Sequence, residues 1–68
     1  MSIEIVVNGE PQNVPVGLNI ADLLSRLGLD PARVAVELNR SIIRRPAWDT
    51  TPLTGGAQLE IVQFVGGG

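Results

Sequence analysis

Three consecutive glycines at the end of the chain point to chemistry at a defined place. Gly66, Gly67 and Gly68 directly follow an apolar segment. Because glycine has no Cβ atom, such a segment adopts almost any φ and can enter a cleft too narrow for other residues. At ~3.3–3.6 Å per residue, three residues reach roughly 10 Å beyond a strand. We therefore expect a flexible tail that presents the carboxylate of Gly68 to another protein, the alternative being a frayed end without function.

The residue types that usually perform catalysis are absent. The 68 residues include no His, no Cys and no Lys, since all five cations are Arg. A Ser-His-Asp or Cys-His arrangement, a thiolate zinc site and a Schiff-base lysine are therefore excluded. The seven carboxylates are scattered singly, with no pair at a metal or glycosidase spacing. We expect a protein that is not an enzyme and that binds no metal or cofactor itself.

Composition narrows the class of protein further. A length of 68 residues allows one small domain, and 44% hydrophobic residues with a net charge of −2 are typical of a globular chain. No segment approaches the ~20 apolar residues of a membrane span, and the N-terminus lacks the layout of a signal peptide. The sequence thus predicts a cytoplasmic protein without a membrane partner. A pI near 4.7 and the lack of an aromatic platform argue against nucleic acid.

Periodicity predicts the strands that must position the glycines. Asn8-Gly9 suits a type I′ hairpin turn, in which both central residues have positive φ. Pro11 and Pro15 lack N–H donors, so the second strand should lie at a sheet edge. The predicted strands cover residues 1–7, 12–16, 34–38, 42–44 and 57–65. The first and last are the most apolar, which places them in the centre of the sheet.

One helix is predicted over residues 19–27. Asn19 and Asp22 suit a capping box at its start, and Gly28 is placed to end it. Its apolar stripe consists of Ile20, Leu23, Leu24 and Leu27. The order ββαβββ predicts an α+β domain over residues 1–65, a β-grasp with a mixed sheet of four to five strands on one helix, followed by the tail over 66–68.

Alternation along the last strand separates a core face from a docking face. We predict that Val62 and Phe64 face away from the helix and form an apolar patch for partners. The alternative is that these two side chains form a second small apolar cluster, covered by the segment around Trp48. Trp48 itself is predicted to be a half-buried lid. The face toward the helix carries Leu59, Ile61 and Val65.

Arginines form a local basic cluster in the second half of the chain. Arg40, Arg44 and Arg45 lie within six positions. We predict that Arg40 and Arg44 contact an acidic surface of a partner. The alternative is a solvated edge strand that its charges protect from aggregation.

The chain resembles the ThiS family of sulfur carrier proteins, in the ubiquitin-like β-grasp superfamily. The resemblance covers the whole chain and is most specific in residues 60–68, EIVQFVGGG. The family often has a Gly-Asp pair before the last strand, whereas here Ala57 follows Gly56. Further matching segments are residues 5–10, 20–24, 34–39 and 43–45, together with Trp48 and residues 51–53.

The resemblance implies how Gly68 would carry sulfur. A carboxylate ionised at pH 7 is a poor electrophile and needs activation. In the family, a ThiF-like adenylyltransferase uses ATP and Mg to form an acyl-adenylate on the last glycine. Sulfur from a cysteine desulfurase persulfide displaces AMP and leaves a thiocarboxylate, which a ThiG-like thiazole synthase uses for the thiazole of thiamine.

Other functions remain open from the sequence. Within the superfamily, the chain could be the small subunit of molybdopterin synthase, or a carrier for tRNA thiolation or cysteine synthesis. Outside carrier function, it could be a β-grasp interaction module with an inert tail.

Overall fold

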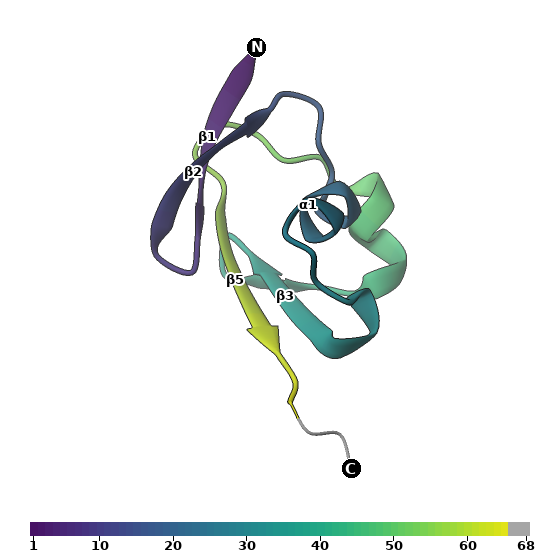
Figure 1. The fold of residues 1–68 in the computed structure, drawn as a ribbon. Helices are drawn as coiled ribbons and strands as arrows, with labels where there is room; N and C mark the ends of the chain where they lie inside the picture. Colours follow the sequence, from purple (N-terminus) through teal and green to yellow (C-terminus); the bar gives the residue numbers. More distant parts are fainter. Residues whose placement is uncertain (66–68) are drawn as a thin grey trace.

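A five-stranded mixed sheet with one α-helix on a single face makes up the described structure, which is a computed structural model covering residues 1–65 (Figure 1). The predicted tail over 66–68 lies outside the described residues. The sheet order is β2-β1-β5-β3-β4, so the predicted α+β fold is confirmed. The elements are β1 (Ser2–Val7), β2 (Glu10–Pro15), α1 (Ile20–Arg26), η1 (Pro31–Arg33), β3 (Val34–Leu38), β4 (Ser41–Ile43), η2 (Arg45–Thr50) and β5 (Gln58–Gln63), where η marks a 3₁₀ helix.

The first and last strands lie inside the sheet, as predicted. β5 runs parallel to β1, with Val7 opposite Leu59, and antiparallel to β3. A parallel pair needs a long crossover, and the chain between β1 and β5 includes α1 on one face of the sheet. β2 contains Pro11 and Pro15 and is an edge strand, as their missing N–H groups require.

The predicted local signals for the hairpin turn and the helix ends are confirmed. Asn8 and Gly9 have φ values of 51° and 83°, both positive as a type I′ turn requires. The capping box is complete, because Asp22 N–H donates to Asn19 Oδ1 at 2.7 Å and Asn19 N–H donates to Asp22 Oδ2 at 3.2 Å. Gly28, with φ of 73°, follows the end of α1.

The core lies between α1 and one face of the sheet and is almost wholly aliphatic. Alternate residues of β1, β3 and β5 point into it, which is why each strand shows buried and exposed side chains in turn. The largest fully buried side chains are Ile5, Ile20, Leu23, Leu24, Leu59, Val14 and Val36. Within residues 1–65, no helix is both long enough and apolar enough to cross a membrane.

The segment between β4 and β5 differs from the prediction. Trp48 is a core residue, only 4% exposed, and not a half-buried lid. It lies in η2, where the sequence analysis predicts no helix, and its Nε1–H donates to the carbonyl of Ile43 at 2.7 Å. An indole can be buried at little cost once its N–H has a partner. The expectation for Val65 is also wrong, because β5 ends at Gln63 and Val65 is 90% exposed.

Candidate functional site

β5 is the strand that leads to the predicted carrier tail. Gly66, Gly67 and Gly68 lie outside the described residues, so the site is defined here by what holds and surrounds β5. β1 pairs with the start of β5, at Gln58 and Leu59, whereas β3 pairs with β5 from Leu59 to Gln63. The second half of β5 therefore has a neighbouring strand on one side only.

Asn8 supports the other side of β5. Its backbone N–H donates to the carbonyl of Leu59 at 2.9 Å and continues the ladder from β1. Its side-chain amide then pairs with Ile61 in both directions: Ile61 N–H donates to Asn8 Oδ1 at 2.7 Å, and Asn8 Nδ2 donates to the Ile61 carbonyl at 3.1 Å. One side chain thus supplies the donor and the acceptor that a further strand residue would supply, and it holds β5 in line toward its exit.

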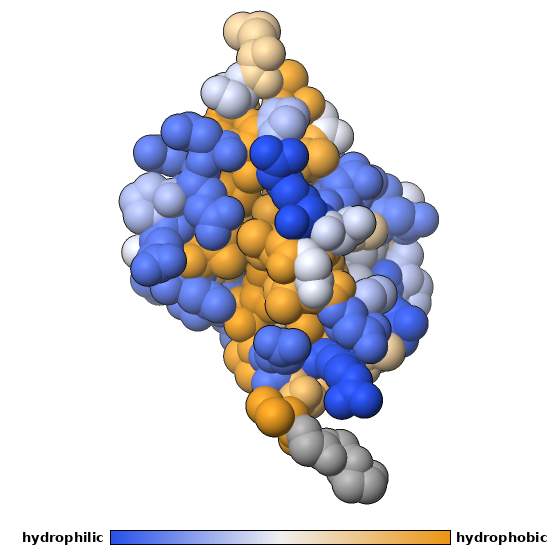
Figure 2. Space-filling view, viewed as in Figure 1, coloured by the Kyte–Doolittle hydropathy of each residue, from blue (hydrophilic) through white to orange (hydrophobic). Residues whose placement is uncertain are grey.

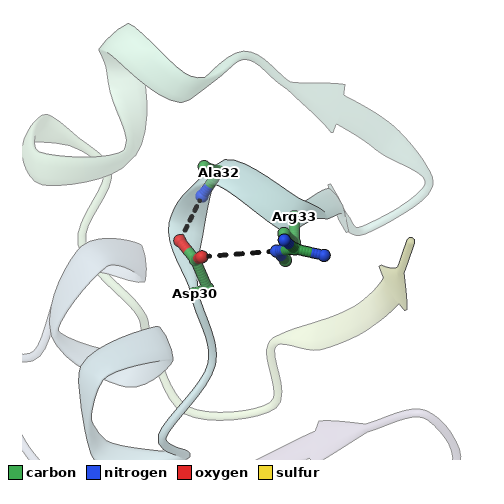
Figure 3. Close-up of polar contacts among 3 residues, drawn as sticks. All are labelled: Asp30, Ala32 and Arg33. Carbon is green, nitrogen blue, oxygen red and sulfur yellow. Dashed lines mark hydrogen bonds and ion pairs between the residues drawn. The ribbon is translucent and has the colours of Figure 1, made fainter. Parts of the chain in front are cut away.

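The short helix η1 provides the last backbone anchor before the tail. Asp30 caps it, with Oδ1 accepting from Ala32 N–H at 2.9 Å and Oδ2 lying 3.6 Å from Arg33 Nε, so that the carboxylate faces both partners (Figure 3). Pro31 at the first position is pre-organised for the turn. The carbonyl of Arg33 accepts from Phe64 N–H at 2.7 Å, one residue beyond the end of β5.

Val62 and Phe64 are exposed on the structure, at 57% and 56% respectively. The segment around Trp48 does not cover them, since Trp48 belongs to the core on the helix side. A hollow of about 110 Å³ lies beside Val62, with Ala35 directly across from it on β3 and Ile42 on β4. The open face of the sheet, away from α1, therefore carries an apolar surface next to the strand that leads to the tail.

Two glutamates border this apolar surface. Glu37 on β3 and Glu60 on β5 are direct cross-strand partners. Like charges in this position destabilise a sheet by roughly 0.2–1 kcal/mol. Within residues 1–65, neither carboxylate takes part in an ion pair, the single ion pair there being that of Arg33 and Asp30.

The predicted arginine cluster is divided by β4. Arg40 occupies the turn before β4 and lines a surface depression with Glu37 and Glu60. Arg44 and Arg45 follow β4 and line a separate groove with Trp48. The three residues of β4 separate Arg40 from Arg44, and four steps along an extended chain span about 13 Å. Arg40 thus shares its depression with the two glutamates that border the hollow beside Val62, whereas the groove of Arg44 and Arg45 shares Ala35 and Ile42 with that hollow.

An apolar band runs along the molecule between two polar flanks and continues to the end of the described chain (Figure 2). At this end Phe64 and Val65 line a shallow depression with Ala32 and Arg33. Exposed apolar area of this kind marks an interaction surface more often than it marks a solvated one. Within residues 1–65, no group of three carboxylates is placed to hold a metal ion.

Sequence reasoning missed Asn8 and Arg33 as supports of the exit strand. Asn8 carried a signal for the hairpin turn, but nothing in its neighbourhood indicates a bond to Ile61, 53 positions away. Arg33 lies 31 positions before Phe64. Both contacts join residues that are distant in sequence, and only the sheet order brings them together.

A mixed sheet of this order over one helix, with its central last strand leading to a glycine tail, defines a ubiquitin-like β-grasp protein. Among solved structures, the chain is similar to the crystal structure of the thiamine biosynthesis protein ThiS from Geobacter metallireducens, with a TM-score of 0.84 and 38% identity over 97% of this chain and 100% of that one. The solution structure of a thiamine biosynthesis protein from the same organism gives a TM-score of 0.81 and 39% identity, over 97% of this chain and 88% of that one.

The ThiS family model matches residues 5–68, and the chain belongs to the ThiS family.

Curated relatives fall into two groups. The chain is 39% identical over 66 residues to the thiazole synthase of Magnetococcus marinus and 38% identical to that of Paramagnetospirillum magneticum. These matches include 97% of this chain, but the chain spans only about a fifth of the length of each thiazole synthase. It is also 37% identical to the uncharacterized protein ycf40 of Pyropia yezoensis, over 98% of this chain and 94% of that protein.

Proposed function

We propose that the chain carries sulfur as a thiocarboxylate on Gly68 and is a protein co-substrate, with the chemistry performed by partner enzymes. The observation that carries the proposal is the family match, which continues through the terminal glycines to residue 68. The residue content supports it, because a chain without His, Cys or Lys can still supply a carboxylate on a docking domain.

Each step then uses the Gly68 carboxylate. Its oxygen attacks the α-phosphorus of ATP on an adenylyltransferase that holds Mg, and pyrophosphate leaves. The terminal sulfur of a desulfurase persulfide attacks the acyl carbon and AMP leaves, which gives an acyl disulfide. A cysteine thiol of a partner supplies the two electrons that release the thiocarboxylate as the partner disulfide forms.

A thiazole synthase is the proposed acceptor of the sulfur. Two relatives named thiazole synthase contain a segment similar to this whole chain as about a fifth of their length. When two domains are joined in one polypeptide in a relative, separate proteins that correspond to these domains are expected to interact. Here the two proteins are this chain and a separate thiazole synthase. In this chain the meeting would bring the Gly68 thiocarboxylate to the acceptor.

Intact-mass analysis tests the proposal directly. The chain is incubated with ATP, Mg²⁺, cysteine, a cysteine desulfurase and the adenylyltransferase of the same organism. We expect a mass gain equal to the replacement of one oxygen by one sulfur, and none when ATP is left out. An unchanged mass with a partner set that is active on another carrier would overturn the proposal.

Variants of the tail locate the reaction. Deletion of Gly68 withdraws the reacting carboxylate by one residue, and Gly67→Val adds a branched side chain where a narrow cleft must be threaded. We expect both variants to lose sulfur transfer while their free energies of unfolding stay within about 1 kcal/mol of the wild type. Full transfer by either variant would show that the tail is not threaded into a partner.

A further inference from the structure

We propose that the hollow formed by Ala35, Ile42 and Val62, called here the open-face hollow, takes one aliphatic side chain of a partner protein that carries an arginine or lysine beside it. The proposal rests on the proposed function, since it names the chemistry of the partner surface that docks a sulfur carrier.

The shape of the hollow follows from one small residue. Ala35 is the direct cross-strand partner of Val62, so a methyl group forms the floor while Val62 and Ile42 rise on either side. Ile42 is 75% exposed and Val62 is 57% exposed. The volume of about 110 Å³ is several times the ~30 Å³ share of one liquid water, and it suits a single branched aliphatic side chain.

The negative charge at the edge of the hollow indicates which kind of residue lies beside the aliphatic side chain of the partner. Glu37 and Glu60 both line the hollow and lie directly across from each other. A cation of the partner between them would relieve their repulsion and add attraction of its own. Arg40 is close to both but, within residues 1–65, makes no ion pair with either. The hollow thus offers an apolar socket with a negative rim, which complements an aliphatic residue next to a basic one.

The position of the hollow limits the distance between a docked partner and Gly68. Val62 lies on β5, the strand that leads directly toward Gly68. Six residues of extended chain span roughly 20 Å. A partner seated on the hollow therefore has Gly68 within about 20 Å, which limits where its active site can lie.

Filling the hollow tests its shape. The adenylyltransferase and the thiazole synthase of the same organism are titrated separately with the full-length chain by calorimetry. Ala35→Leu adds apolar area but occupies the socket, and we expect about five- to tenfold weaker binding to at least one of the two enzymes. Equal or tighter binding to both would show that no side chain enters the hollow.

Shortening a side chain in the wall of the hollow is the experiment that complements filling it. Val62→Ala should weaken binding to the same enzyme by about fivefold. Val16→Ala serves as the control, because Val16 is 58% exposed, as Val62 is, but lies outside the hollow. Equal effects of the two variants would overturn the assignment. Melting curves by circular dichroism establish that each variant is folded.

Neutralising the rim tests the charge. The double variant Glu37→Gln with Glu60→Gln should bind about two- to fivefold more weakly at low salt and should show less salt dependence than the wild type. Glu10→Gln is the control, since Glu10 begins β2 and does not line the hollow. Tighter binding by the double variant would show that the partner presents an acidic surface, and the proposed basic neighbour would be wrong.

The mass assay separates this proposal from the proposed function. At saturating partner concentration the hollow variants should still gain sulfur on Gly68, because their tail is intact and only docking is weakened. If the wild type gains no sulfur, the carrier function fails, whereas the binding comparisons still decide whether the hollow is a docking site. If the hollow variants gain no sulfur at saturation while the wild type does, the hollow acts beyond docking and the proposal is wrong.

Discussion

Asn8 takes the place of a strand residue beside β5. Its amide exchanges two hydrogen bonds with Ile61, and its positive φ is one that asparagine tolerates better than most residues. Two such bonds contribute about 1–3 kcal/mol together. They act at the point where β5 has lost β1 as a neighbour, so they hold the exit strand more than they hold the core.

Replacing Asn8 by glycine isolates these two bonds, since glycine keeps the positive φ without strain. We expect Asn8→Gly to lose about 1–3 kcal/mol of unfolding free energy. The amide of Ile61 should exchange with solvent faster in the variant, as measured by hydrogen exchange. The Leu27 amide, which donates to the Leu23 carbonyl at the C-terminal end of α1, serves as the internal control. Unchanged protection at Ile61 would show that the side chain is not its acceptor.

The Glu37 and Glu60 pair predicts a gain in stability on mutation. Removing one of two like charges that face each other across a strand pair relieves roughly 0.2–1 kcal/mol. We expect Glu60→Gln to raise the free energy of unfolding by that amount at low salt, as measured by urea titration. The difference from the wild type should shrink at high salt because salt screens exposed charges. A loss of stability would mean that Glu60 is paired in solution.

Among the secondary-structure elements, β5 has one face in the core beneath α1 and one face that is exposed. Ile61 is 8% exposed in the core beneath α1, whereas Phe64 is 56% exposed, and its backbone N–H donates to the carbonyl of Arg33. The alternation of side chains along the strand predicts which of residues 59–62 are buried and which are exposed. Beyond the end of β5, the bond to the Arg33 carbonyl of η1 fixes the position of the Phe64 backbone. β5 and the residue that follows its end therefore stabilise the domain on one side and, on the other, carry exposed apolar side chains that we propose as a docking surface.

The two faces are separable by truncation. Ile61→Ala should cost about 2–5 kcal/mol of folding stability, a large share of the stability of so small a domain. Phe64→Ala should cost much less and instead weaken partner binding by about 1 kcal/mol or more. Chemical unfolding and calorimetric titration measure the two effects. If Phe64→Ala unfolds the domain as readily as Ile61→Ala, Phe64 is a core residue and not part of a docking surface.

At the scale of the whole molecule, Trp48 connects the segment after β4 to the common core. It packs in the same cluster as the buried residues of α1 and the sheet, and its indole N–H is bonded to Ile43. Because it is the single tryptophan, its fluorescence reports on the core from one position. The domain should therefore unfold as one unit, with fluorescence and circular dichroism following the same transition.

Trp48→Phe tests this connection. The variant leaves the Ile43 carbonyl without its indole donor, and we expect a loss of about 1–3 kcal/mol in unfolding free energy, together with a single transition by circular dichroism. A second transition, or a change below about 0.3 kcal/mol, would show that η2 is attached only loosely to the core.

Local signals in the sequence were sufficient for most of the elements. The Asn8-Gly9 turn, the capping box at Asn19 and the glycine after α1 each depend on residues within a few positions of one another. Such features follow from local chemistry and do not require contacts with distant parts of the chain. Segment 45–50 is the exception, because this 3₁₀ helix, with Pro46 in its first turn, owes its place to the burial of Trp48, which depends on the assembled core.

Residue identity and spacing were enough to establish the class of fold, the interior place of the first and last strands in the sheet, and the absence of His, Cys and Lys. Periodicity and composition carry this information because they depend on residue identity and spacing alone. The folded chain was needed to show that Asn8 bonds to Ile61, that the Arg33 carbonyl accepts from Phe64, and that Glu37 lies opposite Glu60. These pairs join residues 23 or more positions apart, so strand order and register, which arise when the sheet closes over α1, determine which of them meet.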